Sequence, residues 1–102
     1  MKDVSVVLPC LNEEEGLGAA ITTILTVFKD NSIEGEIIVV DNGSTDSTAI
    51  IAQDFPVVYV YEPARGYGNA YRSGFAKAQG MHVIMGDPDS SYDFNEIPKF
   101  LN

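Results

Sequence analysis

A regular alternation between short β-branched runs and longer segments of helical periodicity is the feature that most constrains how this chain can fold. The runs typical of strands occupy residues 4–8, 36–40, 57–61 and 81–85, and Pro9 is expected to end the first of them. They lack a clean alternation of apolar and polar residues, which is typical of strands covered on both faces. Strands that alternate with helices imply right-handed crossover connections and a parallel sheet. The sequence therefore predicts an α/β fold, a three-layer sandwich built on a parallel sheet.

The segments between these runs carry helical spacing and signals for helix ends. In the first segment, apolar residues recur at the intervals of an amphipathic helix, at Leu17, Ala20, Ile21, Ile24, Leu25 and Phe28. Asn12 is predicted to be the N-cap of this helix, and Glu15 three residues later completes a capping box. A second helix is predicted to follow residues 44–46. A third is predicted over residues 70–79, with Gly80 as its C-terminal cap.

Length, charge and cysteine content narrow the class of protein. The 102 residues are enough for one domain, and the net charge of −9 argues against nucleic acid or an anionic membrane surface as a partner. No apolar run approaches the roughly 18 to 20 residues of a membrane span, and the first residues do not form a signal peptide. The single cysteine, Cys10, fits a reducing compartment and is expected to pack in the core rather than act as a nucleophile. We therefore expect a cytoplasmic protein.

Polar residues gather after the carboxyl end of every predicted strand. Residues 12–13 follow the first run, 41–46 the second, 62–69 the third and 87–93 the fourth. The carboxyl ends of parallel strands share one rim of the sheet, and ligands bind along that rim in open α/β folds. Loops are polar in general, but four loops that are all acidic or glycine-bearing indicate a binding site.

The pair Asp87 and Asp89, directly after the fourth run, is the sharpest local signal. Two carboxylates one residue apart can converge on a hard divalent cation that also binds substrate phosphates. Such a cation would let an acidic protein hold a diphosphate. The alternative is a solvated turn that only caps a helix. From the residues alone, the metal site and the turn are equally well supported.

Two further rim segments carry candidate ligand contacts. A carboxylate at the strand end, as in Asp41, can accept hydrogen bonds from a base or a ribose, or cap the next helix. Gly66 and Gly68 begin like a dinucleotide fingerprint, but Tyr71 stands where the third glycine belongs, and the pair follows the third strand rather than the first. We interpret these glycines as a tight loop that lets the backbone approach a ligand or the sheet. Arg65 beside them could meet a phosphate or form a surface ion pair.

Four motifs, each at a strand end, carry a family resemblance. They are residues 7–14 (VLPCLNEE), 39–46 (VVDNGSTD), 64–70 (ARGYGNA) and 85–93 (MGDPDSSYD). Together they resemble family-two glycosyltransferases of the GT-A fold, and most of all the branch of polyprenyl-phosphate (dolichyl-phosphate-type) mannosyl- and glucosyltransferases. Each motif is short, but four in this order, covering nearly the whole chain, are specific. The resemblance implies the Rossmann-like half of a nucleotide-diphospho-sugar transferase.

The resemblance also implies roles for the matching positions. The residues that would line the pocket for the nucleotide-sugar are Pro9, Asn12, Glu13, Asp41, Arg65, Gly66 and Gly68. Among them, Asp41 would bind the base. Asp87 and Asp89 would form the catalytic DxD pair, with Asp89 as the direct ligand of Mg²⁺ or Mn²⁺ and Asp87 near the ribose or the waters of the metal.

The implied reaction is transfer of a hexose, with inversion, from a UDP- or GDP-sugar to a polyprenyl phosphate. The metal would stabilise the leaving diphosphate. A phosphate acceptor is already anionic near neutral pH, since its second pKa is about 6, so positioning would matter more than a strong general base. A lipid acceptor would bring the protein to the cytoplasmic face of a membrane.

Two departures from the family pattern stand out. Pro88 occupies the middle of the DxD pair, where a small residue such as Ala is more frequent, and it should stiffen the loop without removing a carboxylate. The family's domain is also much longer, with its acceptor half after the DxD pair, whereas the helix expected near Glu96 and Pro98 is too short to be stable alone. We therefore expect residues 1–102 to be the N-terminal donor-binding part of a GT-A domain that lacks its acceptor half.

Three other expectations accompany this interpretation. A haloacid-dehalogenase-like phosphotransferase would use Asp87 as a nucleophile in a DxDxS motif, although it would leave Asp41 and the first loop unexplained. A non-catalytic nucleotide-binding fragment is the alternative outside enzymes, in which the chain alone only binds donor. The fourth apolar run is also expected to leave an unpaired strand edge, which favours a homo-oligomer.

Overall fold

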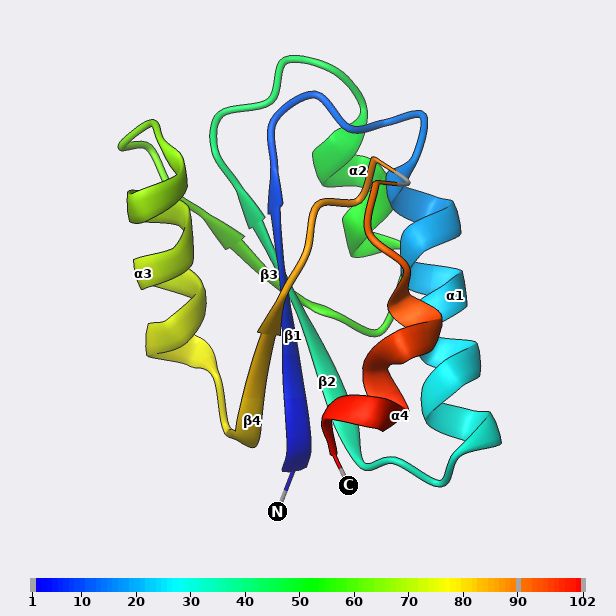
Figure 1. Cartoon of the computed structure of the whole chain (residues 1–102). Helices are drawn as coiled ribbons and strands as arrows, with labels where there is room; N and C mark the ends of the chain where they lie inside the picture. The colour runs from blue at the N-terminus through cyan, green and yellow to red at the C-terminus, as the bar shows by residue number, and fades with distance from the viewer. Residues whose placement is uncertain (1, 90, 102) are drawn as a thin grey trace.

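The fold is a four-stranded parallel sheet with helices on both faces. The computed structural model describes residues 2–89 and 91–101, so Ser90 of the last motif and the terminal residues of the predicted 1–102 domain lie outside the described residues. The elements are β1 (Lys2–Cys10), α1 (Leu17–Asp30), β2 (Gly35–Asp41), α2 (Thr48–Gln53), β3 (Val58–Tyr61), α3 (Tyr67–Lys77), β4 (Gly80–Met85), the 3₁₀ turn η1 (Phe94–Glu96) and α4 (Ile97–Phe100). The strand order is β3-β2-β1-β4, and every neighbouring pair is parallel (Figure 1).

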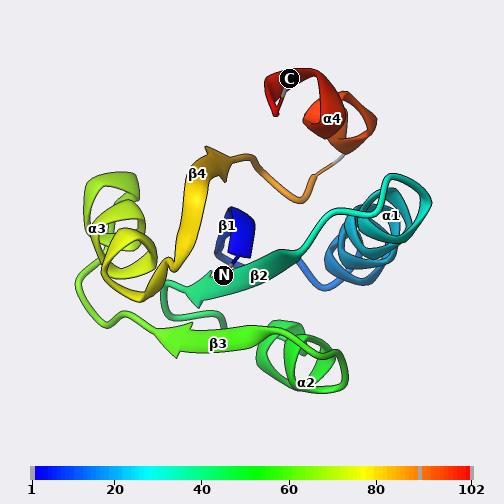
Figure 2. The same cartoon turned by 90° about the horizontal axis from the view of Figure 1, so that it is seen from below.

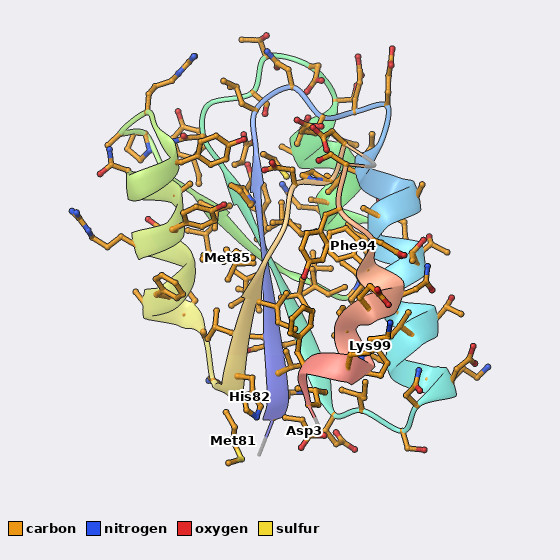
Figure 3. All side chains as sticks on the ribbon, in the orientation of Figure 1. Asp3, Met81, His82, Met85, Phe94 and Lys99 are labelled. Carbon is orange, nitrogen blue, oxygen red and sulfur yellow. The ribbon has the colours of Figure 1, made fainter. Side chains whose placement is uncertain are left out.

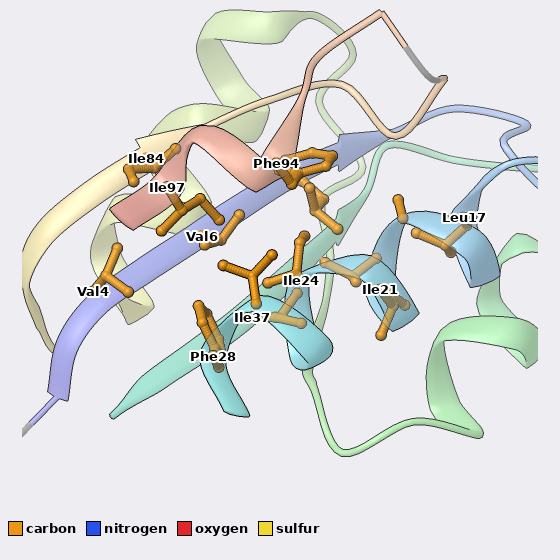
Figure 4. Close-up of a cluster of buried hydrophobic side chains, with 14 of the residues drawn as sticks. Val4, Val6, Leu17, Ile21, Ile24, Phe28, Ile37, Ile84, Phe94 and Ile97 are labelled. Atoms are coloured by element: carbon orange, nitrogen blue, oxygen red, sulfur yellow. The ribbon is translucent and has the colours of Figure 1, made fainter. Parts of the chain in front are cut away.

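Three layers confirm the predicted α/β sandwich. Viewed from below, α3 lies on one face of the sheet, while α1, α2 and α4 lie on the other (Figure 2). The larger core packs α1 and the η1–α4 segment on the sheet (Figure 4), with these residues among its members: Val4, Val6, Ile21, Ile24, Ile37, Phe94 and Ile97. A smaller core places Val7, Ile38 and Val40 against Ala70 of α3. Alternate residues of β1 and β2 therefore serve opposite cores, which explains why both strands are continuous apolar runs.

The prediction that Pro9 ends the first strand is wrong. β1 continues through Pro9 and Cys10, which pair with β2. The carbonyl of Val7 accepts from Gly86 N on the β4 side, whereas the carbonyl of Cys10 accepts from Asn42 N on the β2 side. The backbone of Pro9 therefore points to the same side as that of Val7, toward β4, but β4 has already ended there. Proline lacks an N–H, and at this position no hydrogen bond of the sheet is lost because of it.

The predicted capping box at Asn12 and Glu15 is also absent. Helix α1 begins at Leu17, and its N-cap is Gly16, which has no side chain to cap it. Asn12 has a left-handed backbone with φ of 55°, a conformation that asparagine tolerates. Its side chain bonds to a different loop, described below.

The predicted cap at Gly80 is wrong as well. Helix α3 ends at Lys77, and Gly80 is the first residue of β4. A Cβ at this position would lie 2.5 Å from the backbone nitrogen of Ser5. Glycine is required here because β4 approaches β1 closely, not because a helix ends.

Strand β4 forms one edge of the sheet, as predicted, but it is not covered on both faces. Met81 is 71% exposed, and Val83 and Met85 are each 37% exposed. The side chains of Met81 and Met85 are labelled in Figure 3. Helix α3 packs chiefly on β1 and β2 and leaves this part of the sheet open. The predicted homo-oligomer stays a prediction. Within residues 2–89 and 91–101, none of the helices combines the length and apolar character that a membrane crossing requires.

Candidate functional site

The loops after β1 and β2 are joined by side-chain hydrogen bonds at the carboxyl rim of the sheet. We call residues 11–16 and 42–48 the paired loops. The side-chain oxygen of Asn12 accepts from the backbone N–H groups of Thr45 at 2.8 Å and Asp46 at 3.3 Å. In return, the N–H of Asn12 donates to Ser44 Oγ at 2.9 Å. The function of Asn12 in this structure is to join two loops more than thirty residues apart.

Thr48 makes a second joint between the paired loops. Its hydroxyl is fully buried, accepts from the N–H of Glu13 at 2.9 Å and donates to Asp46 Oδ1 at 2.5 Å. Burial raises the pKa of Asp46, but the hydrogen bonds from Thr48 and from Glu14 N outweigh it and lower that pKa overall. The carboxylate of Asp46 is thus held ionised beside Glu13.

Asp41 is buried beneath these loops and bonded within the protein. It is 2% exposed, and its Oδ1 accepts from the N–H groups of Gly43 at 3.2 Å and Ser44 at 2.8 Å. The hydroxyl of Tyr59 donates to the other oxygen at 2.7 Å. Burial and this bond to Asp41 raise the pKa of Tyr59 to about 12. Asp41 orders the turn after β2, and its burial leaves little of its surface for the predicted bond to a base.

Asn42 positions the next rim segment, a role that sequence reasoning missed. Its amide nitrogen donates to the carbonyls of Glu62 and Ala64, and its oxygen accepts from the N–H of Gly66, each at 2.9 Å. The side chain is 7% exposed. Residues 62–68, which we call the glycine loop, are therefore anchored by one buried amide. The positive φ of Gly66, 117°, lets the chain turn directly into α3.

A cavity of about 310 Å³ lies between the first strand end and the glycine loop. Its lining contains these residues: Pro9, Cys10, Leu11, Glu13, Asn42, Arg65, Gly66, Tyr67 and Ala70. Four predicted site residues, Pro9, Glu13, Arg65 and Gly66, thus meet in one place. Gly68 does not line this cavity, and a Cβ there would meet no atom within 4 Å, so its predicted close approach to the sheet is absent.

Cys10 forms part of the wall of this cavity without being reactive. It is 2% exposed, and its thiol donates to the carbonyl of Leu8. Burial, together with the carboxylates of Glu13, Asp41 and Asp87, raises the pKa of the thiol far above its ordinary value. The expectation that Cys10 packs in the core is confirmed.

The DPD loop, residues 86–93, carries both predicted metal ligands. The hydroxyl of Tyr67 donates to Asp87 Oδ1 at 3.1 Å. Asp89 Oδ1 accepts from the N–H and the hydroxyl of Ser91, and these bonds lower the pKa of Asp89. Among the described residues, both aspartates accept these bonds at Oδ1, so Oδ2 is the oxygen of each that is available to another ligand.

A second, larger cavity of about 790 Å³ is lined by residues of the DPD loop and of the start of α1. Glu13 lines both cavities, and it is joined in the larger one by Asn12 and Asp89. At the edge of this cavity the backbone of Gly16 lies against Pro88. A Cβ at position 16 would stand 2.5 Å from the Pro88 carbonyl oxygen. The DPD loop therefore touches α1 at a point where only glycine fits.

Negative charge accumulates where the cavities meet. Burial and the charges of Asp89, Asp87 and Asp46 raise the pKa of Glu13. Across the described ranges 2–89 and 91–101, the one ion pair joins Lys99 to Glu96, away from this cluster. The four carboxylates are therefore not neutralised by a basic side chain within salt-bridge distance.

This donor set fits a hard divalent cation, which prefers carboxylate and phosphate oxygens. Within the part of the chain that the structure describes, no three His, Cys, Asp or Glu side chains are close enough to hold a metal by themselves. A cation here would need further oxygen ligands, and a bound diphosphate supplies such oxygens. The two aspartates thus fit a metal shared with a phosphate-bearing ligand better than a closed protein cage.

Comparison with known proteins places these features in a family. The model for glycosyl transferase family 2 matches residues 5–102. The low-salt glycan biosynthesis hexosyltransferase Agl6 of Haloferax volcanii is 41% identical over 99 residues, which cover 97% of this chain and 24% of that protein. An uncharacterized glycosyltransferase of Mycobacterium bovis, Mb0553, is 41% identical over 98 residues, or 96% of this chain and 42% of its own length. The chain thus spans less than half the length of these relatives.

Solved structures share the fold. Mannosyl-3-phosphoglycerate synthase from Rubrobacter xylanophilus has a TM-score of 0.84 with 26% identity, covering 94% of this chain and 33% of that one. Glucosyl-3-phosphoglycerate synthase from Mycobacterium tuberculosis has a TM-score of 0.73 with 33% identity, covering 85% of this chain and 33% of the synthase. That synthase was crystallised with Mn²⁺, UDP and glucosyl-3-phosphoglycerate.

Proposed function

The chain belongs to glycosyltransferase family 2, and from this membership we propose that residues 1–102 are the donor-binding part of a GT-A hexosyltransferase. The observation that carries the proposal is the meeting of two features at the carboxyl rim. One is a cavity bordered by Glu13, Arg65 and Gly66, and the other is a group of carboxylates without basic partners that includes Asp87 and Asp89. The first suits a nucleotide, and the second suits a cation that binds the nucleotide's diphosphate.

In this proposal the donor is a UDP- or GDP-hexose. Pro9 and Gly66 provide an apolar wall and exposed backbone for the nucleoside, and Arg65 provides the positive charge of this cavity for a phosphate oxygen. The free oxygens of Asp89 and Asp87 would hold Mg²⁺ or Mn²⁺. When bound, the cation supplies positive charge that stabilises the diphosphate as it leaves the sugar. The complex of the M. tuberculosis synthase with Mn²⁺ and UDP supports both ligands.

The paired loops prepare this site before any ligand arrives. Asn12, Thr48 and Asn42 fix the loop backbones by hydrogen bonds, so little conformational entropy is lost when the donor binds. Positioning of donor and acceptor, rather than a covalent step, is what these residues offer. In this proposal the hexose is transferred with inversion, as the family resemblance implies.

The acceptor we propose is a phosphorylated molecule. The motifs favour a polyprenyl phosphate, whereas the names of the solved relatives point to phosphoglycerate. A polyprenyl phosphate would bring the protein, which we take to be cytoplasmic, to the cytoplasmic face of a membrane. Hexose-transfer assays with a polyprenyl phosphate and with phosphoglycerate distinguish the two acceptor classes.

The sequence left two alternatives, a haloacid-dehalogenase-like phosphotransferase and a non-catalytic nucleotide-binding fragment, and the family assignment affects only the first. Membership in a glycosyltransferase family displaces the haloacid-dehalogenase-like phosphotransferase. A chain that binds donor without turnover stays compatible with the proposal. Transfer of the hexose by the 102-residue chain alone would exclude that alternative.

Calorimetric titration of the chain with UDP and GDP, with Mn²⁺ or with EDTA, tests the proposal. We expect binding that weakens at least tenfold in EDTA and with Asp89→Asn, which keeps the shape of the side chain but removes its charge. Asp30→Asn is the matched control, because it changes the net charge equally at the far end of α1. Equal affinity with and without the cation would exclude the metal role, and no binding of either nucleotide would exclude donor binding.

A further inference from the structure

The hydroxyl of Tyr67 connects two rim segments that are otherwise separate. It donates to Asp87 Oδ1 at 3.1 Å, across twenty residues of sequence. Among the described residues of the DPD loop, this is the one side-chain hydrogen bond that comes from another element. The other side-chain bonds there, from Ser91 to Asp89 and from Asn95 to Asp93, are local. The orientation of Asp87 therefore depends on a residue at the start of α3.

Tyr67 is itself held from outside the DPD loop. The buried amide of Asn42 anchors the backbone of Ala64 and Gly66 immediately before it. The ring of Tyr67 stacks on Tyr71 one turn later in α3, with ring centroids 5.8 Å apart and planes inclined by 25°. The hydroxyl thus has a position set by the glycine loop and α3, whether or not Asp87 accepts its bond.

Asp87 needs such a donor because its charged neighbours repel it. Asp87 and Asp89 stand one residue apart in the DPD loop, and the charges of both carboxylates act on Glu13. Without a partner, the Asp87 side chain would favour rotamers that turn away from this cluster into solvent. A neutral hydroxyl on Oδ1 keeps the side chain in the cluster and leaves Oδ2 available.

We propose that Tyr67 is a positioning residue that holds Asp87 toward Asp89 and thereby sets the affinity of the site for a divalent cation. The inference rests on the proposed function, in which both aspartates face the cation. Tyr67 does not need to touch the cation for this role. It removes part of the entropy cost of ordering Asp87 when the cation binds.

The matched variants are Tyr67→Phe and Tyr71→Phe. Each removes one hydroxyl and keeps the stacked ring pair, but only Tyr67 bonds to Asp87. Because the cation also needs oxygens from a diphosphate, Mn²⁺ binding to the chain is measured in the presence of UDP, by the electron paramagnetic resonance of free Mn²⁺, against the same UDP without protein. We expect Tyr67→Phe to weaken Mn²⁺ binding about three- to tenfold, within the range of one hydrogen bond to a charged group at a partly exposed site. Tyr71→Phe should change the dissociation constant less than twofold.

Asp87→Asn completes a double-mutant cycle, which tests the metal role of Asp87 separately from the positioning role of Tyr67. If Tyr67 acts through Asp87, adding Tyr67→Phe to Asp87→Asn should weaken Mn²⁺ binding no further. Unchanged Mn²⁺ affinity in Asp87→Asn would overturn the metal role in the proposed function. A loss in Asp87→Asn with none in Tyr67→Phe would overturn only the positioning role. Equal losses from Tyr67→Phe in both backgrounds would also overturn it. Because Tyr67 is 60% exposed, loss of its hydroxyl leaves the core intact, and thermal unfolding checks this.

Discussion

The paired loops and the DPD loop share one rim of the sheet, but they are held in different ways. The paired loops are joined through Asn12 and Thr48 and rest on the buried Asp41. Among its described residues, the DPD loop receives one side-chain bond from another element, from Tyr67, and it also has a backbone bond from Gly86 to Val7 and a tight contact at Gly16. The side proposed to bind the nucleotide is therefore built in advance, while the side proposed to bind the cation is held by fewer bonds between elements.

The largest expected effect comes from removing the buried amide that anchors the glycine loop to the paired loops. Asn42→Ala would leave the carbonyls of Glu62 and Ala64 and the N–H of Gly66 without their partner. We expect the free energy of unfolding to fall by about 2–4 kcal/mol, as for a buried group with several hydrogen bonds. Chemical denaturation measures this change.

The same substitution in the segment that follows the DPD loop is the control. Asn95 is exposed, and its side chain bonds only to Asp93. Asn95→Ala should change the free energy of unfolding by less than about 0.5 kcal/mol. Equal losses from the two variants would mean that the two sides of the rim are equally ordered, contrary to the comparison above.

A smaller effect is expected where the two regions touch. Gly16→Ala would put a Cβ 2.5 Å from the Pro88 carbonyl oxygen and force the DPD loop away from α1. We expect a loss of about 1–2 kcal/mol from this overpacking. In nuclear magnetic resonance spectra, the amide shifts of Asp87 and Asp89 should move, while those of Thr45 and Asp46 should not.

Gly68→Ala is the corresponding control in the glycine loop. A Cβ there meets no atom within 4 Å, and the residue lies in the first turn of α3. The variant should be neutral or stabilising by up to about 1 kcal/mol, because alanine restricts the unfolded chain. A Gly16→Ala variant as stable as this control, with unchanged shifts, would show that the DPD loop does not rest on α1.

The comparison also explains which features the sequence could predict. The parallel sheet and its layers follow from the apolar runs, whose residues pack on both faces at β1 and β2. The acidic rim follows from the topology, since every strand ends at the same edge. Asp87 and Asp89 could be proposed as metal ligands because only one residue separates them in the sequence.

The failures concern contacts between distant segments. Asn12 is a good N-cap by local rules, but it binds N–H groups more than thirty residues away. Pro9 is tolerated in β1 only because β4 ends earlier, at Met85. Local sequence patterns do not reveal such distant partners. The hydrogen bonds of Asn42 and the role proposed for Tyr67 therefore had no signal in the sequence except their place inside the motifs.

The smallest expected effect concerns the support beneath the paired loops. Tyr59→Phe removes the bond to Asp41 Oδ2, and we expect a loss of about 1 kcal/mol near neutral pH. Folding favours the neutral phenol, whose pKa is raised from 10.0 to about 12. Tyr59 therefore contributes stability that is complete below pH 10 and is lost as pH rises through about 12.

Ultraviolet absorbance of the phenolate during an alkaline titration checks the raised pKa of Tyr59. A transition centred near pH 12 should be present in the parent chain and absent in Tyr59→Phe. Tyr61→Phe, which removes an exposed tyrosine from the same strand, should leave that transition in place. If Tyr59→Phe leaves it unchanged, the phenol does not donate to Asp41 in solution. The carboxylate would then have an oxygen free for the predicted contact with a base, and the nucleotide side of the rim would be less fixed than its hydrogen bonds indicate.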